Sequence, residues 1–269
     1  MRPLIITVFM GNVEATDTAI LDMLKQDGEP TVLAVQQGAE ELLLLGRQET
    51  PRLILWRHNP PLPSLAATWN RALDFAWEIG CDEAMVVNND VRLHKETYLA
   101  LHEGRRLTNA WFISGVGVTA EQFQDEPDTW GPEHSLADRG GPDFSCFLIS
   151  RECHAKYRFD ENLIPAYMED MDYHRRLMLG GDGDRIFSVN VPYLHIDRGS
   201  GTLKAMTPEK RAAHEKRISE GSRAYYARKW GGGANEETYR EPFSGHAQEG
   251  VKTSEMFGVV RAGWNASKS

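Results

Sequence analysis

The stretch Glu83-Ala84-Met85-Val86-Val87-Asn88-Asn89-Asp90 decides the fold class predicted for this chain. Residues 83–87 form a short, mainly apolar run with the length of a buried strand, and three polar residues follow it directly. Ligands of open α/β sheets usually bind beyond the carboxyl ends of the strands. The stretch therefore predicts a strand whose end carries polar side chains to the ligand-binding edge of a sheet.

The segments on both sides of this stretch alternate between strand and helix patterns. A helix is expected from about Leu65 to Ile79, where Ser64 can cap the first turn, and another around Lys95 to Leu107. Further strands are expected at residues 4–9, 31–35, 53–56, 111–118, 144–150 and 186–191, with a short apolar run at 42–45 and helices at 15–25, from 169 and at 208–230. This alternation predicts an α/β fold with a mostly parallel sheet flanked by helices.

Composition limits the classes of function. A net charge of −9 over 269 residues gives no general attraction for nucleic acid or for an anionic bilayer. No run of about eighteen apolar residues is present, so no transmembrane segment is expected, and any membrane contact would be peripheral. The three cysteines have no CxxC spacing, which predicts neither a disulfide framework nor a cysteine zinc site and favours the cytoplasm.

Three groups of residues can carry chemistry. Asp90 can ligate a divalent cation, although Asn-Asn-Asp is also common in tight turns. Glu169, Asp170 and Asp172 crowd the start of a predicted helix, where acidic residues also complement the helix dipole. His195 follows a predicted strand, and we expect it to lie near Asp90; a lone histidine is more often only part of the core or surface.

These features resemble family 2 and related GT-A glycosyltransferases, in that family's order, over roughly residues 4–230. They are the opening strand and turn at 4–12, the helix carrying Asn70, residues 86–90 in place of a DXD element, the segment 141–176 with its Glu169-Asp170 motif, and the segment 195–200. Within the family the chain looks most similar to a rhamnosyltransferase-like subgroup. The resemblance implies a GT-A catalytic domain over 1–205, on which a C-terminal helix and irregular tail over 206–269 pack.

The resemblance also implies roles for individual residues. Asp90 and His195 would hold Mn²⁺ or Mg²⁺, and Asp170 would be the general base of an inverting transfer of a hexose or deoxyhexose. The residues implied on the donor side are Thr7, Phe9, Gly11, Asn12, Gln36, Asn70, Asn88, Asn89, Ser200 and Arg223. The residues implied on the acceptor side are Glu169, Asp172, Arg175 and Trp130, the last within a predicted lid at residues 119–140. As alternatives, Arg223 would belong to a solvated helix face, and Trp130 would only anchor the loop.

Two departures from the family pattern leave specificity open. The DXD element is reduced to one carboxylate, Asp90, and Gln36-Gln37 replace the acidic residue expected after the second strand.

A sugar nucleotidyltransferase is disfavoured because residues 10–14 lack a Gly-rich basic loop. A metal-dependent hydrolase, and a GT-A-like protein that binds a sugar nucleotide with little or no catalysis, stay open as alternatives.

The expected partners are a nucleotide diphosphate sugar and an acceptor that offers a hydroxyl group. The acceptor would be a saccharide or another hydroxyl-bearing molecule, and the net charge of −9 does not support a nucleic acid acceptor. A homo-oligomer is compatible with the sequence, which does not determine the oligomeric state.

Overall fold

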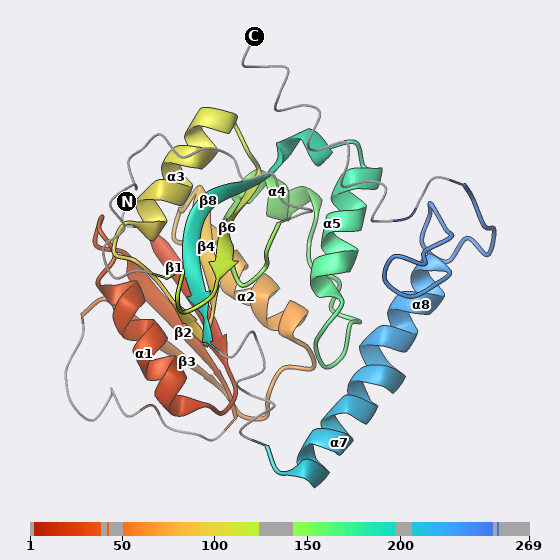
Figure 1. The fold of residues 1–269 in the computed structure, drawn as a ribbon, viewed down its shortest axis with the longest axis horizontal. Helices are drawn as coiled ribbons and strands as arrows, with labels where there is room; N and C mark the ends of the chain where they lie inside the picture. Colours follow the sequence, from red (N-terminus) through yellow and green to blue (C-terminus); the bar gives the residue numbers. More distant parts are fainter. Residues whose placement is uncertain are drawn as a thin grey trace.

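The computed structural model describes residues 3–38, 42, 51–123, 142–196, 206–249 and 252. Its strands form one eight-stranded sheet in the order β3-β2-β1-β4-β7-β6-β8-β5 within these ranges. Helices cover both faces of this sheet (Figure 1). The α/β class and the helix-covered sheet predicted from the sequence are therefore confirmed.

The first half of the chain builds the parallel part of the sheet. Its elements are β1 (Leu4–Phe9), α1 (Val13–Leu24), β2 (Thr31–Gln37), β3 (Leu53–His58), α2 (Leu65–Glu78) and β4 (Glu83–Asn88). Strand β1 pairs in parallel with both β2 and β4, and β2 pairs in parallel with β3. Ser64 caps α2 through its hydroxyl, which accepts the backbone N–H of Ala67, as the sequence predicts.

The second half of the chain makes the sheet mixed. Its elements are β5 (Val91–Arg92), α3 (Thr97–Thr108), β6 (Phe112–Val118), β7 (Cys146–Ser150), α4 (Arg151–Lys156), α5 (Glu169–Leu179), the 3₁₀ turn η2 (Gly183–Arg185) and β8 (Ile186–His195). Strand β7 runs antiparallel to β4 and β6, and β5 runs antiparallel to β8. The short strand β5 and the short helix α4 have too few residues for a periodic pattern, and the sequence did not predict them.

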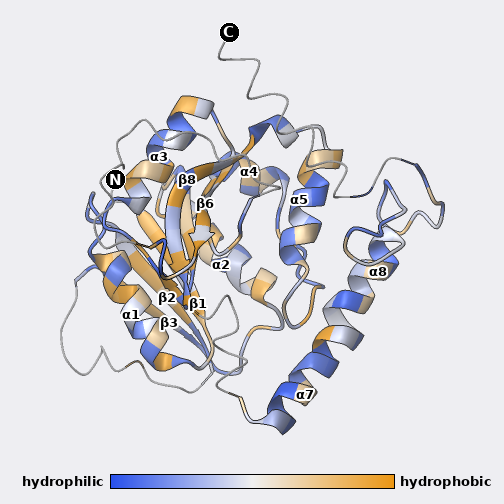
Figure 2. Ribbon diagram, in the orientation of Figure 1, coloured by the Kyte–Doolittle hydropathy of each residue, from blue (hydrophilic) through white to orange (hydrophobic). Residues whose placement is uncertain are grey.

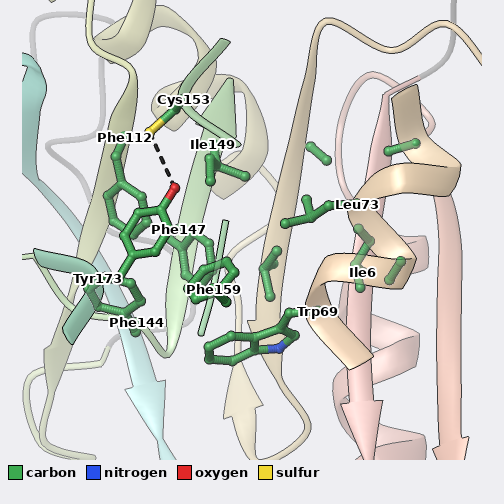
Figure 3. Close-up of a cluster of buried hydrophobic side chains, with 14 of the residues drawn as sticks. Ile6, Trp69, Leu73, Phe112, Phe144, Phe147, Ile149, Cys153, Phe159 and Tyr173 are labelled. Carbon is green, nitrogen blue, oxygen red and sulfur yellow. Dashed lines mark hydrogen bonds between the residues drawn. The ribbon is translucent and has the colours of Figure 1, made fainter. Parts of the chain in front are cut away.

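Two apolar clusters lie on opposite faces of the sheet. One contains residues of α2, α4 and α5, and the other contains residues of α1 and α3. Figure 2 shows the strands as mainly hydrophobic, which agrees with a sheet buried on both faces. In the first cluster, Phe159 stacks on Tyr173 at a ring-centroid distance of 4.3 Å, and Phe112 stacks on Phe147 at 4.7 Å (Figure 3).

The C-terminal segment is a long helix interrupted by one wide turn. It comprises α7 (Pro208–Ile218), the π-helical turn η4 (Ser219–Arg223) and α8 (Ala224–Trp230). Gly231 ends it in the left-handed conformation with φ of 72°, as the predicted glycine stop requires. Helix α7 is largely exposed, and Figure 2 shows it as mainly hydrophilic. In α8, Tyr226 and Trp230 pack against Leu163.

Several predicted features lie outside the described residues. These are residues 43–45 of the apolar run, residues 124–140 of the predicted lid including Trp130, and Ser200. Across the ranges that the structure covers, none of the helices combines the length and apolar character needed to cross a bilayer.

Candidate active site

Asp90 and His195 meet at one edge of the sheet. Strand β5 begins directly after Asp90, and Val91 pairs with His195, the last residue of β8. The backbone N–H of Ile196 donates to the Asp90 carbonyl at 2.8 Å, which fixes the two segments relative to each other. The Nε2 atom of His195 lies 3.1 Å from Oδ1 of Asp90. The structure thus brings together the two residues predicted to hold a metal.

The electrostatics of this pair favour a positive charge between the two side chains. Burial alone would lower the pKa of His195, but the hydrogen bond and charge of Asp90, together with the charge of Asp143, raise it above its ordinary value. Asp90 is only 5% exposed, so its carboxylate interacts through little solvent. A proton on the imidazole is one source of that positive charge, and a divalent cation is another.

The donor atoms of the pair suit a divalent cation. A carboxylate oxygen and an imidazole nitrogen face each other, and this combination matches Mn²⁺ well because Mg²⁺ prefers oxygen ligands. Among the residues that the structure describes, no group of three or more His, Cys, Asp or Glu side chains is arranged to hold a metal. Within these residues Asp90 and His195 are the pair that could hold a cation, and oxygens of a bound ligand could complete its coordination.

A pocket of about 350 Å³ opens beside this pair and contains Asp170. Its lining also includes Asp143, Gly115, Gly117, Phe144 and Ser188. Asp143 is held in place because its Oδ1 accepts the N–H of Ser145 at 2.8 Å. The hydroxyl of that same Ser145 lies 3.4 Å from Nδ1 of His195, so Ser145 links the pocket to the pair of Asp90 and His195.

Two neighbouring carboxyl groups at the start of α5 have raised pKa values. Desolvation raises the pKa of Asp170 although the residue retains solvent contact, and the charge of Asp143 raises it further, against backbone hydrogen bonds that lower it. Glu169 is buried, and this burial raises its pKa to about 8. Of Glu169 and Asp170, Asp170 is the one that borders the pocket and meets solvent, so it is the better candidate for a group that exchanges protons with a ligand.

Asn70 occupies a different environment from the donor-facing one implied by the resemblance. It is 1% exposed and holds the backbone of Phe159 through both its N–H and its C=O group. It also donates to Glu161 and accepts from Nε2 of His154. Trp77 donates to Nδ1 of the same imidazole, so Nε2 carries the proton. Asn70 anchors the segment that leads to α5.

Asp172 and Arg175 also face the protein interior rather than the pocket. Asp172 is 0% exposed and bonds with Lys229, Trp230 and Arg176. Arg175 is likewise 0% exposed, and it donates to the backbone carbonyl of Tyr239. Both residues lie where they attach the C-terminal segment to α5, and neither has the surface that contact with an acceptor would need.

The residues implied on the donor side lie at the ends of β1, β2 and β4. Thr7 and Phe9 are fully or almost fully buried, as is Gln36, which donates to the carbonyl of Gly38. Gly11 and Asn12 have φ values of 71° and 48°, so the chain turns sharply after β1.

The remaining described donor-side residues lie near that turn, at the end of β4 and in the C-terminal helix. Asn89 donates to the hydroxyl of Thr16, which in turn donates to the carbonyl of Asn12. Asn88 is half-buried at the end of β4, and Arg223 is exposed at the end of η4.

Two residues that the sequence analysis missed lie close to these groups. Asp143 lies shortly before β7, whereas Asp90 drew attention because it follows a strand, and the segment before Asp143 was interpreted as a lid. Tyr167 is 40% exposed and has a φ of 74°. Burial of its hydroxyl and the charges of Glu169, Asp90 and Glu215 raise the pKa of Tyr167 against the opposing charge of Arg223. Tyr167 therefore lies within electrostatic range of both Asp90 and Arg223.

Comparisons with solved structures define the fold class. No family model and no curated protein sequence matches the chain. The chain resembles residues 1–349 of S. aureus TarS in complex with UDP-GlcNAc, with a TM-score of 0.55 and 14% identity over 82% of this chain and 66% of that one. It also resembles S. aureus TarS over 81% of this chain and 43% of that one, with a TM-score of 0.54 and 12% identity.

A third structure extends the same likeness to another protein. GalNAc-T7 with UDP, GalNAc and Mn²⁺ matches with a TM-score of 0.53 and 10% identity, over 73% of this chain and 44% of that one. The chain spans less than half the length of S. aureus TarS and of GalNAc-T7. The protein has the GT-A fold, as the sequence resemblance predicted.

Proposed function

We propose that this protein is a glycosyltransferase that moves a sugar from a nucleotide diphosphate donor to a hydroxyl group of an acceptor. The observation that carries the proposal is the contact between Asp90 and His195 at one edge of the sheet, together with Asp143, which lines the pocket with Asp170 and whose charge acts on both His195 and Asp170. Three solved structures of similar fold contain UDP or UDP-GlcNAc, and one of them contains Mn²⁺, which supports a nucleotide sugar and a divalent cation as ligands here.

The catalytic unit in this proposal is residues 1–205, with residues 206–269 packed on it. The donor nucleotide binds near the turn at Gly11 and Asn12, where β1, β2 and β4 end together. Asp90 and His195 would hold Mn²⁺ or Mg²⁺, which offsets the negative charge of the departing diphosphate. The family 2 and rhamnosyltransferase-like assignments, and the cytoplasmic location, stay predictions from the sequence.

Asp170 acts as the general base in this mechanism. Its Oδ1 accepts the N–H of Met171, which orients the carboxylate and leaves Oδ2 for the acceptor. As the acceptor oxygen bonds to the anomeric carbon, its proton passes to Asp170, and the electron pair of the breaking C–O bond leaves with the diphosphate. Attack opposite the leaving group inverts the configuration at the anomeric carbon. The raised pKa of Asp170 improves its match to a proton transfer near neutral pH.

The test separates donor binding from chemistry. Nucleotide sugars with different bases and sugars are titrated into the protein by calorimetry, with Mn²⁺ or with EDTA. At least one should bind, more tightly with Mn²⁺, and should give transfer to a saccharide panel. Asp170→Asn should lower the transfer rate by about two to four orders of magnitude, with donor affinity unchanged. Equal rates for Asp170→Asn and the unaltered protein would remove Asp170 from the role of base.

One alternative function is a sugar-nucleotide-binding protein with little or no catalysis. The observation that favours it is the single carboxylate at residues 88–90, together with the small number of protein ligands for a metal in the described ranges. Tight donor binding without transfer or donor hydrolysis, in the unaltered protein and in Asp170→Asn alike, would support this alternative. Absence of binding by every nucleotide sugar would contradict both functions.

A further inference from the structure

Lys229 is a buried lysine that joins two parts of the chain. Only 5% of its surface is exposed, and its Nζ lies 2.6 Å from Oδ2 of Asp160 and 2.6 Å from Oδ1 of Asp172. Asp160 stands at the start of the loop 160–168, and Asp172 stands in the first turn of the helix that follows this loop. One ammonium group therefore fixes both ends of the segment that leads to Asp170.

The two carboxylates are built to receive this charge. Trp230 and Arg176 also donate to Asp172, and Tyr225 donates to Asp160. A buried charge is costly unless it is paired and hydrogen-bonded. Displacement of any of these groups would therefore be unfavourable, which holds them in their positions. With both carboxylates 2.6 Å away, the ammonium group of Lys229 is engaged within the protein.

The wide turn η4 contacts the middle of the same loop. The Ser222 hydroxyl donates to the carbonyl of Ala166 at 2.6 Å. At Gly221 a Cβ atom would lie only 2.2 Å from the carbonyl oxygen of Ile164, so the approach of helix to loop depends on this glycine. Turns of the π type often occur at functional sites in helices. The turn η4 and the loop 160–168 therefore approach so closely that their backbones are in contact.

The loop ends in a conformation that needs outside support. Tyr167 and Met168 have φ values of 74° and 73°, a region that residues with a side chain rarely adopt. Two such residues in succession persist only when surrounding contacts hold them. Helix α5 begins at the next residue, Glu169, and Asp170 follows it. The direction of the Asp170 side chain thus depends on the path of the loop.

We propose that the C-terminal helix positions the general base, with Lys229 as the main positioning residue and Ser222 as a second contact. This inference rests on the proposed function, in which Asp170 removes the acceptor proton. It assigns to the C-terminal segment a part in catalysis, through the loop 160–168 and without contact between Lys229 and a substrate.

The test compares Lys229→Met with Lys229→Arg, Ser222→Ala and the control Lys216→Met. Lys216 lies on α7, is exposed and pairs only weakly with Glu220, at 3.8 Å. UDP-GlcNAc with Mn²⁺ is the probe, and donor affinity, kcat for transfer or hydrolysis, and its pH profile are measured well below each variant's unfolding temperature. Local hydrogen exchange in residues 160–172 and in residues 84–92 is measured by mass spectrometry.

Lys229→Met should keep donor affinity within about twofold, lower kcat at least tenfold and shift the pH profile. Its exchange should rise in residues 160–172 and not in 84–92. Lys229→Arg should recover part of kcat, Ser222→Ala should lower kcat about threefold or more, and Lys216→Met should match the unaltered protein. If Lys229→Met does not fold, Ser222→Ala and Lys229→Arg decide the question by the same measurements.

A folded variant with a lower Tm but unchanged kcat, pH profile and loop exchange would show that the contacts serve stability alone and would overturn the inference. In that outcome the unaltered protein still binds the donor and acts on it, so the proposed function stands. If the unaltered protein neither binds UDP-GlcNAc nor any other nucleotide sugar, the proposed function itself fails, and the inference fails with it.

Discussion

Replacement of Asn70 by alanine tests whether this residue serves the donor or the fold. The change removes four hydrogen bonds, two to the backbone of Phe159 and one each to Glu161 and His154. Three of the groups left behind are buried: the N–H and C=O of Phe159 and the Nε2 proton of His154. Each buried group left without a partner costs about 1–3 kcal/mol. Entry of water into the space offsets part of this cost.

We therefore expect Asn70→Ala to lower the free energy of unfolding by about 3–5 kcal/mol. Urea unfolding followed by tryptophan fluorescence measures this quantity, and calorimetry with UDP measures nucleotide affinity on the folded fraction. Nucleotide affinity should stay within about twofold, because Asn70 is 1% exposed and its side chain is fully used within the protein.

The control is Asn162→Ala, which removes an exposed amide that donates to Asp160 at 2.9 Å. Its unfolding free energy should change by less than about 1 kcal/mol. The reasoning would be refuted if Asn70→Ala cost no more than this control while nucleotide affinity fell tenfold. That pattern would mean that Asn70 contacts the donor, as the sequence resemblance implied.

Three further outcomes are expected. Burial lowers the pKa of His154 to about 4, below its ordinary value of 6.5. The neutral form therefore stabilises the fold above pH 6.5, and this stability is lost as the pH falls toward 4. His154→Gln should weaken the dependence of the unfolding free energy on pH in this window, and an unchanged dependence would contradict the reasoning. Asp90→Ala and His195→Ala should each abolish most of the Mn²⁺-dependent rise in Tm measured with UDP, and a full rise in both variants would place the metal elsewhere. Gly117→Val should fill the pocket beside Asp143 and lower kcat/KM for the acceptor at least tenfold with donor affinity kept, and normal acceptor kinetics would show that the acceptor binds outside this pocket.

The local pattern of the sequence predicted most of the regular elements. The strands at residues 4–9, 31–37, 53–58 and 83–88 follow from short apolar runs, because a strand buried on both faces needs apolar side chains in succession. Ser64 and Gly231 marked helix ends correctly, since capping and left-handed geometry depend on the residue itself. The pairing of Asp90 with His195 was also predicted, because both follow strands that end at one edge.

Tertiary structure alone decided what the remaining polar residues contact. Asn70, Asp172 and Arg175 have side chains that suit a ligand or a partner within the protein equally well, and only the packing of distant segments makes them internal. The sequence likewise determined that Lys229 lies on a helix, whereas its burial between Asp160 and Asp172 required the fold. Periodicity and capping depend on a few neighbouring residues and can therefore be recognised in the sequence. Ion pairs and hydrogen bonds between segments some 60 to 90 residues apart depend on the path of the whole chain, which no local pattern specifies.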